Sequence, residues 1–293
     1  MPDLLLSATV ANDGVAVFSA ITTGTVREIR ARHDLSPTAT AAVGRLLTGA
    51  VLLAANLKGS ERISLQISGD GPIGGVTADA WLLDHETIGA RAYARNPHAD
   101  LPFDERGKFD VSGSIGDGVL QVTKSYEVGQ PYVGVVPLHS GEIAEDIALY
   151  FAQSEQIPSV VALGVLANPT GVVAAGGIVA QVLPGTEEGA IVALEQRALA
   201  MRPVTTLVAD GADARGLLDE IAGHVDLRAL RSTHVRFACL CTKRKVEAAL
   251  LGLGREELER MRIERERTEA TCEFCRCVYL FSRQELAALA DRI

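Results

Sequence analysis

Five cysteines lie in the last fifth of the chain, and none occurs in the first 238 residues. They form a C-x-C pair, Cys239 and Cys241, and, after thirty intervening residues, a group of Cys272, Cys275 and Cys277. A C-x-C pair combined with a C-x-x-C pair, at a separation that one small module can close, is the spacing of a four-thiolate metal site. Zn2+ is the metal best suited to such a site, because it accepts a tetrahedral all-sulfur shell and does no redox chemistry itself.

Two other interpretations of the cysteines are weaker. Iron–sulfur ligation is disfavoured, because the pattern matches neither common ferredoxin spacing. A set of buried or disulfide-bonded cysteines is disfavoured too, because chance would scatter five cysteines along 293 residues.

The amino terminus and the thiols indicate a reducing compartment. The first residues lack a basic n-region, and Asn12, Asp13 and Gly14 interrupt the apolar run, so the segment does not fit a secretory signal peptide. A cytoplasmic chain keeps its thiols reduced, and clustered cysteines there indicate metal binding or redox activity rather than permanent disulfides. We therefore expect a cytoplasmic protein.

The net charge of −9 is carried by the residues that precede the cysteines. Residues 237–293 hold eleven Lys and Arg against ten Asp and Glu, which leaves 17 against 27 for residues 1–236. An acidic body argues against nucleic acid as a partner. We therefore expect no nucleic-acid partner.

One uncharged stretch has the length of a membrane span. No charged residue occurs between Glu155 and Glu187, but Asn168, Pro169 and Gly171 form a strong turn signal in the middle. The stretch is therefore expected to form two short strands of a buried hairpin, and no membrane partner is expected.

Residues 1–184 are expected to form an α+β domain with a large, mostly antiparallel sheet and a few packed helices. Ser36 is the N-cap and Pro37 the first residue of a helix whose body covers 38–58; this body is apolar nearly all round and is therefore expected to be buried. Ser140 is expected to cap a second helix over 141–156. Alternating apolar residues and turn signals predict a hairpin over 4–18 and strands over 62–68, 74–82, 88–93, 108–112, 120–126, 132–136, 160–166 and 172–183.

A composition break at 184–189 separates this domain from two further regions. Residues 185–236 are expected to be a helical linker with helices over 191–201 and 215–224, which must lie on the large domain because so few residues bury little alone. Residues 237–293 are the expected metal module, with helices over 243–251 and 256–267 and a strand over 278–281. The capping box Ser282-x-x-Glu285 opens a final helix whose apolar residues are Leu286, Leu289 and Ile293.

The cysteine spacing is accompanied by further segments in a fixed order. Tyr279-Leu280-Phe281 follows the second cysteine group, and SGDGP, YVGVV, YFxxSEQxP, AAGG and QVLP stand at 68–72, 132–136, 150–158, 174–177 and 181–184. In this combination the whole chain resembles the redox-regulated holdase chaperones, the 33-kilodalton heat-shock protein family.

The resemblance implies three parts: an α+β core domain (1–184), a helical linker folded over it (185–236) and a zinc-binding redox-switch domain (237–293). Cys239, Cys241, Cys272 and Cys275 would bind one Zn2+ in the reduced state. Oxidation would form the disulfides Cys239–Cys241 and Cys272–Cys275, zinc would leave, the small domain would unfold and the linker would come loose. The protein would then hold unfolding client proteins without ATP under oxidative stress. It would be a homodimer when oxidised and not an enzyme.

Two positions depart from the family pattern. Cys277 adds a thiol two residues past Cys275, and it could compete as a ligand or as a disulfide partner. Arg276 stands where the turn of a zinc knuckle favours glycine.

Two other functions fit parts of the sequence. A zinc-ribbon nucleic-acid module would use Lys243-Arg244-Lys245, but aromatic residues for base stacking are scarce. A thiol–disulfide oxidoreductase would use Cys272 and Cys275, but that motif normally opens a helix, whereas a strand is expected to follow it here.

Overall fold

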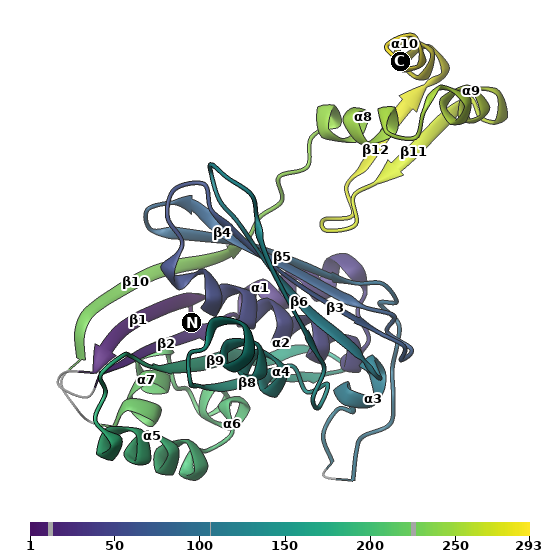
Figure 1. Cartoon of the computed structure of the whole chain (residues 1–293). Coiled ribbons are helices and arrows are strands. Elements are labelled where there is room, and N and C mark those ends of the chain that lie inside the picture. The colour runs from purple at the N-terminus through teal and green to yellow at the C-terminus, as the bar shows by residue number, and fades with distance from the viewer. Residues whose placement is uncertain (11–13, 106, 224–226) are drawn as a thin grey trace. The chain divides into compact units, whose positions relative to one another are not determined.

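The computed structural model describes residues 1–10, 14–105, 107–223 and 227–293. These residues divide into two compact units, Met1–Ala238 and Cys239–Ile293, which can be followed in Figure 1. Each unit has apolar cores of its own, two in the larger unit and one in the smaller, as far as the described residues extend.

The larger unit is built on one sheet. Within the described ranges the sheet has ten strands in the order β7-β6-β3-β4-β5-β10-β1-β2-β9-β8. Neighbouring strands are antiparallel except β5 and β10, which are parallel. This confirms the predicted α+β class and the mostly antiparallel sheet. The strands are β1 (Leu4–Val10), β2 (Val15–Ile21), β3 (Arg62–Gly69), β4 (Val76–Asp84), β5 (Thr87–Ala94), β6 (Gly118–Ser125), β7 (Tyr132–Pro137), β8 (Ser159–Asn168), β9 (Gly171–Val182) and β10 (Leu227–Phe237).

Helix α2 (Pro37–Leu53) is the central helix of this unit. The Ser36 hydroxyl accepts a hydrogen bond from the Ala39 N–H at 3.1 Å, which confirms the predicted N-cap. A 3₁₀ turn, η1 (Ala54–Asn56), continues α2, so the helix ends before the predicted boundary at residue 58. Among the described helices, Pro37–Asn56 is long and apolar enough to cross a membrane, but 83% of its most apolar window is buried inside the protein. It is therefore the core helix of a packed unit.

Both predicted hairpins are confirmed. β1 and β2 are antiparallel, with Leu4 opposite Ile21 and Val10 opposite Val15. Of the predicted turn between them, Asn12 and Asp13 lie outside the described residues. β8 and β9 form the second hairpin, so the uncharged stretch is two strands rather than one helix.

Two local predictions in this unit were wrong. The strand expected over 108–112 is replaced by the short helix α3 (Val111–Ile115), because the Asp110 carboxylate caps it by accepting the Gly113 N–H at 2.7 Å. The second wrong prediction is that Ser140 caps the next helix. That helix is α4 (Ala144–Tyr150), continued by the π-helical turn η2 (Phe151–Glu155).

The start of α4 depends on a buried carboxylate. The side chain of Asp146 accepts hydrogen bonds from the backbone N–H groups of His139, Ser140, Gly141 and Ile143, at 2.7–3.4 Å. Asp146 is fully buried, so these donors satisfy side-chain oxygens whose burial would otherwise be costly. A carboxylate three residues into the helix thus does what the sequence assigned to Ser140.

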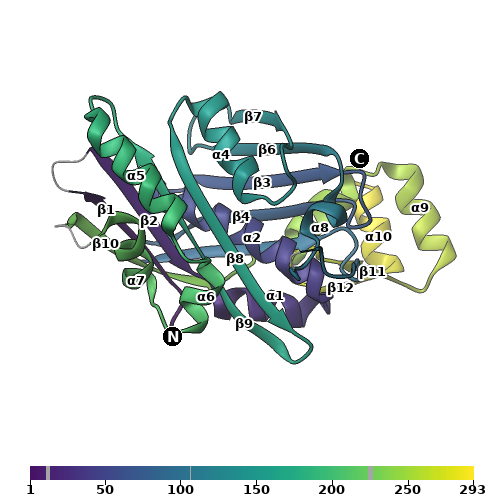
Figure 2. The same ribbon diagram turned by 90° about the horizontal axis from the view of Figure 1, so that it is seen from below.

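The residues after 184 form three helices that pack on the sheet and one strand that belongs to it. Helices α5 (Glu188–Ala200), α6 (Val204–Ala209) and α7 (Ala214–Ala222) lie against β1, β2 and β9 and enclose a second apolar core (Figure 2). The sequence predicted α5 and α7 and their position on the large domain, although His224, the predicted end of the last helix, lies outside the described residues. The strand β10, which follows them and inserts between β5 and β1, was not predicted.

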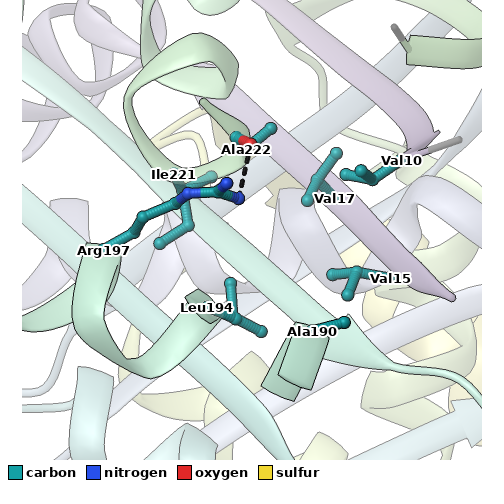
Figure 3. Close-up of a pocket in the computed structure, with 8 residues that line it drawn as sticks. All are labelled: Val10, Val15, Val17, Ala190, Leu194, Arg197, Ile221 and Ala222. Carbon is teal, nitrogen blue, oxygen red and sulfur yellow. Dashed lines mark hydrogen bonds between the residues drawn. The ribbon is translucent and has the colours of Figure 1, made fainter. Parts of the chain in front are cut away.

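The contact between α5, α7 and the sheet can be seen in Figure 3. Leu194 of α5 and Ile221 of α7 face Val17 of β2 around a small cavity. The guanidinium Nη1 of Arg197 donates to the Ala222 carbonyl at 2.7 Å and so joins α5 to the carboxyl end of α7. This side chain ties the two helices together where they cover the sheet.

Candidate metal centre

The second cysteine group closes a hairpin in the smaller unit. Strands β11 (Arg267–Thr271) and β12 (Val278–Ser282) are antiparallel, and residues 272–277 join them. The Cys272 N–H donates to the Cys277 carbonyl and the Arg276 N–H donates to the Cys272 carbonyl, both at 2.9 Å. Arg276 has a φ of +60°, so it adopts the left-handed conformation for which the sequence pattern favours glycine.

The first cysteine pair lies at the start of helix α8 (Lys243–Leu251), whose predicted bounds are confirmed. The Thr242 hydroxyl accepts the Lys245 N–H at 3.3 Å and caps the helix. The ammonium of Lys245 donates to the Leu240 carbonyl at 2.7 Å. The second bond holds the backbone between Cys239 and Cys241, and the first fixes the helix start that follows it.

The four predicted ligands are brought together. The Sγ atoms of Cys239, Cys241, Cys272 and Cys275 all lie within 4.8 Å of one another. The Sγ of Cys239 is 3.8 Å from that of Cys272, and the Sγ of Cys241 is 3.3 Å from that of Cys275. Their role as ligands stays a prediction, and their arrangement is that of one cluster.

The geometry of this cluster fits a tetrahedral metal ion. A Zn–S bond of about 2.3 Å places neighbouring sulfurs of a tetrahedron roughly 3.8 Å apart. The Cys239–Cys272 and Cys241–Cys275 sulfur separations lie at and below that value, no pair of the four sulfurs is more than 4.8 Å apart, and four sulfur donors are a shell that suits zinc. The residues present therefore fit Zn2+.

Cys277 lies apart from the four thiols. Its side chain is exposed, whereas Cys275 is 6% exposed and the other three are partly buried. The Cys277 carbonyl accepts the Cys272 N–H, so its backbone shapes the loop while its thiol faces solvent. The C-x-x-C motif stands between two strands, not at the start of a helix, which disfavours the oxidoreductase hypothesis.

Tyr279 contributes to the site, and the sequence did not assign it a role. Its hydroxyl donates to the Sγ of Cys241 at 3.1 Å. This hydrogen bond raises the pKa of Tyr279, since ionisation would remove the donor from the sulfur. The only available signal was its position in β12 next to the second cysteine group.

Replacing Tyr279 by Phe should weaken metal binding without disturbing the fold. The change removes one donor to a ligand sulfur and keeps the ring, and loss of such outer partners typically reduces metal affinity by about 10–100-fold. Zinc affinity of the reduced protein, measured by competition with a chelating dye, should show this loss. An unchanged affinity would mean that the Tyr279 hydroxyl does not support the site.

Cys272 and Cys275 hold protons when no metal is bound. Burial raises the pKa of Cys272 and, more strongly, that of Cys275 above the ordinary value of 9.0. In the metal-free module the protonated thiols are therefore the stable form, and the fold loses that contribution as the pH rises through and beyond 9.0. A bound divalent cation would have to displace these protons.

Metal affinity should consequently fall as the pH falls. Below the raised pKa values Cys272 and Cys275 each exchange one proton for the metal, so the apparent affinity should drop by at least about 100-fold per pH unit. Competition titrations of the reduced protein at pH 6, 7 and 8 would measure this slope. A change below tenfold per unit would show that these thiols are already ionised in the metal-free protein.

The apolar core around the site is small. Among the described residues of the smaller unit it consists of Leu250, Leu258, Phe281, Leu286, Leu289 and Ala290. Helices α9 (Arg255–Glu264) and α10 (Arg283–Ala290) supply part of it. Helix α9 ends before the predicted residue 267, which instead begins β11. The predicted Ile293 lies past α10 and is 56% exposed, so it adds nothing to the core.

The predicted capping box of Ser282 and Glu285 stabilises the start of α10. The Ser282 hydroxyl accepts the Glu285 N–H, and the Glu285 carboxylate accepts the Ser282 N–H at 2.8 Å, which confirms the capping box. The same carboxylate pairs with Lys243 at 2.5 Å, and these donors lower the pKa of Glu285 to about 2. This pair connects the start of α8, beside the first cysteines, with the start of α10.

Comparisons with known proteins agree along the whole chain. The family model described as Hsp33 protein matches residues 3–282. The proteins named 33 kDa chaperonin from Bacillus cytotoxicus and Bacillus mycoides are each 38% identical to the chain over 295 residues, covering 100% of both chains. The crystal structure of the 33 kDa chaperonin of Thermotoga maritima, a heat shock protein 33 homolog, is 37% identical. It covers 100% of this chain and 99% of its own, with a TM-score of 0.91.

Proposed function

The chain belongs to the Hsp33 family and is a chaperone, and from that premise we propose that it is an ATP-independent holdase that oxidation switches on. The observation that carries the redox part of the proposal is the cluster of Cys239, Cys241, Cys272 and Cys275, with all four sulfurs within 4.8 Å. Its clients are unfolding proteins, and it acts in the cytoplasm by binding rather than by catalysis.

In the reduced state the four thiols bind one Zn2+ and the protein is inactive. When bound, zinc supplies a tetrahedral cross-link and keeps the thiols in the thiolate form, which is also the oxidisable form. Tyr279 donates a hydrogen bond to one of these sulfurs, and the loops at 239–241 and 272–277 orient them. The same residues thus act as ligands and as sensors.

Oxidation proceeds in two equal steps. Two thiolates, Cys239 with Cys241 or Cys272 with Cys275, lose two electrons to one hydrogen peroxide. Two protons are taken up, a disulfide forms and two water molecules are released. Disulfide sulfur is neither charged nor a good ligand, so the site loses the donors that hold the cation.

Loss of the metal unfolds the smaller unit. Structural zinc sites contribute roughly 10–16 kcal/mol of apparent binding free energy at neutral pH, whereas whole domains are typically stable by about 5–15 kcal/mol. The core of this unit is too small to compensate for such a loss. Zinc release and unfolding should therefore occur together.

The switch reaches the chaperone surface through residues 185–236. We assign residues 1–184 as the core domain, 185–236 as the linker and 237–293 as the redox switch. The linker ends in β10, which is followed almost directly by Cys239, so the switch and the linker are neighbours along the chain and unfolding of the switch would act on the linker from this end. Helices α5–α7 would then leave β1, β2 and β9 and expose the apolar residues of the second core, through which oxidised chains would also dimerise.

One experiment tests this function. The zinc-loaded protein is treated with hydrogen peroxide at raised temperature or with hypochlorous acid, and zinc release and suppression of aggregation of a thermally unfolding client are measured together. Both should rise in parallel, and reduction with added zinc should reverse both. Complete zinc release without anti-aggregation activity would refute the proposal. Tight, salt-sensitive binding of DNA or RNA by the reduced protein would favour the zinc-ribbon function instead.

A further inference from the structure

Strand β8 has an open backbone edge. It stands at one end of the ten-stranded sheet, and among the described residues it pairs with β9 alone. In an antiparallel ladder only part of a strand's N–H and C=O groups bond to one neighbour, and the others point to the opposite side. The outer edge of β8 therefore presents a row of hydrogen-bonding groups.

A cavity of about 530 Å³ lies along this edge. Its lining includes all seven consecutive residues 161–167. Successive side chains of a strand point to opposite faces, so a cavity that touches seven residues in a row lies beside the strand and not over one of its faces.

The cavity has two walls, one on each face of β8. Phe103 and Phe109, with ring centroids 5.3 Å apart, and Glu145 of α4 stand on the side of the first core. Residues 201–205 form the other wall. They approach closely, because a Cβ on Gly164 would lie 2.8 Å from a Thr205 side-chain atom. A segment that lies between these walls reaches the strand edge.

The sequence of β8 lacks the usual protection of an edge strand. Natural edges carry charged residues, prolines or bulges that prevent pairing with other chains. β8 reads SVVALGVLAN, without charge or proline, and its register irregularity lies at the far end, between Leu166 and Ala167. An unprotected edge strand promotes aggregation, because it can pair with strands of other chains. Its presence here suggests that such pairing serves the function of the protein.

We propose that this cavity binds an extended, uncharged, apolar segment of a non-native polypeptide, which adds to β8 as an eleventh strand. Main-chain hydrogen bonds to β8 provide affinity that does not depend on sequence, and alternate side chains of the segment contact the first wall and the side of the strand that residues 201–205 now cover. This inference rests on the proposed function and names the part of a client that the chaperone binds.

A second copy of this chain does not fit the same edge. Its own β8 lies beside the same first wall, so the first walls of the two copies would meet before the strand edges did. The walls also carry Arg45, Lys108 and Arg202 against Glu145, and a symmetric pairing would bring like charges together. An extended, uncharged client segment has neither walls nor charges that would oppose pairing with β8.

The second wall connects this cavity to the redox switch. Residues 201–205 belong to the region that, in the proposed function, comes loose on oxidation. Their departure would open the edge of β8 and the face that carries Val160 and Ala162, which now pack in the second core. Segments should therefore bind more tightly to the oxidised protein than to the reduced one.

A labelled peptide tests the backbone part of the proposal. The probe is a fluorescein-labelled decamer of alternating valine and threonine, titrated with the oxidised full-length protein and followed by fluorescence anisotropy. A matched decamer that is N-methylated at its four central residues keeps the side chains but loses strand donors. It should bind at least about tenfold more weakly. Equal binding of the two peptides would overturn strand addition.

Two matched variants test the location. Leu166 lies in the cavity and is 39% exposed, whereas Val173 on β9 is 45% exposed and does not line it. L166K should weaken binding of the unmethylated peptide at least about tenfold, and V173K should stay within about twofold. Phe103→Ala changes a wall residue that is 65% exposed and lies outside β8, and it should also weaken binding of the unmethylated peptide. Similar affinities for L166K, Phe103→Ala and V173K would overturn the proposal.

The outcomes separate this inference from the proposed function. If the oxidised protein suppresses client aggregation but does not bind the peptide, the cavity is not the client site and the chaperone function stands. If neither activity appears, the proposed function itself fails. Conversion of an oxidised dimer to a monomer by L166K, measured by light scattering, would show that β8 pairs with a second copy and would also overturn the inference.

Discussion

Replacing Cys275 by Ser is expected to abolish zinc binding and unfold residues 239–293 while the larger unit stays folded. Cys275 is the most buried of the four clustered thiols, and a serine hydroxyl is a poor zinc donor. The zinc contribution of roughly 10–16 kcal/mol exceeds what this small core can supply. Zinc content after dialysis against a chelator and hydrogen exchange of the smaller unit would measure both effects.

Cys277→Ser is the matched control, because it makes the same change two residues later at an exposed thiol. This variant should retain one zinc per chain and the protected module. The reverse result, with zinc retained in Cys275→Ser and lost in Cys277→Ser, would make Cys277 the fourth ligand and refute the assigned set.

Replacing Leu217 by Asp is expected to activate the chaperone without an oxidant. Leu217 of α7 is fully buried in the second core, between the linker helices and the sheet. An unpaired carboxylate there costs several kcal/mol, so α7 should leave the sheet. The reduced, zinc-loaded variant should then suppress aggregation of a thermally unfolding client, measured by light scattering, at levels close to those of the oxidised wild type.

Leu199→Asp in α5 is the control for this prediction, because Leu199 is 89% exposed. It should remain inactive until oxidised. Arg197→Ala is a milder variant that removes the hydrogen bond to the Ala222 carbonyl, and it should lower the oxidant dose needed for activation. A reduced Leu217→Asp protein with detached helices, shown by hydrogen exchange, and no chaperone activity would rule out the linker as the element that is released.

Much of the fold follows from local patterns. The Ser36 cap, the Pro37 start and an apolar surface on nearly every side predict α2, because these signals lie within one segment and need no distant partner. The capping box at Ser282 and Glu285 is confirmed for the same reason. Where a distant or unexpected group supplies the cap, as Asp146 does for α4, a local pattern predicts the wrong start.

The position of β10 could not be predicted from its own residues. It is rich in charged and polar side chains, and its partners in β1 and β5 lie far away along the chain. Strand pairing depends on which edges remain open after other strands have paired, and that is a property of the whole sheet. The open edge of β8 and the cavity beside it could not be predicted from the sequence for the same reason.

For the metal centre, too, some features follow from the sequence and others only from the tertiary structure. The sequence by itself determined the number, type and spacing of the thiols, because sulfur chemistry and chain length limit which sites four cysteines can build. Only the tertiary structure decided that Cys239 faces Cys272, that Cys241 faces Cys275 and Tyr279, and that Cys277 points to solvent. These are contacts between a helix start and a hairpin loop, and they exist only when α8, β11 and β12 pack on one core.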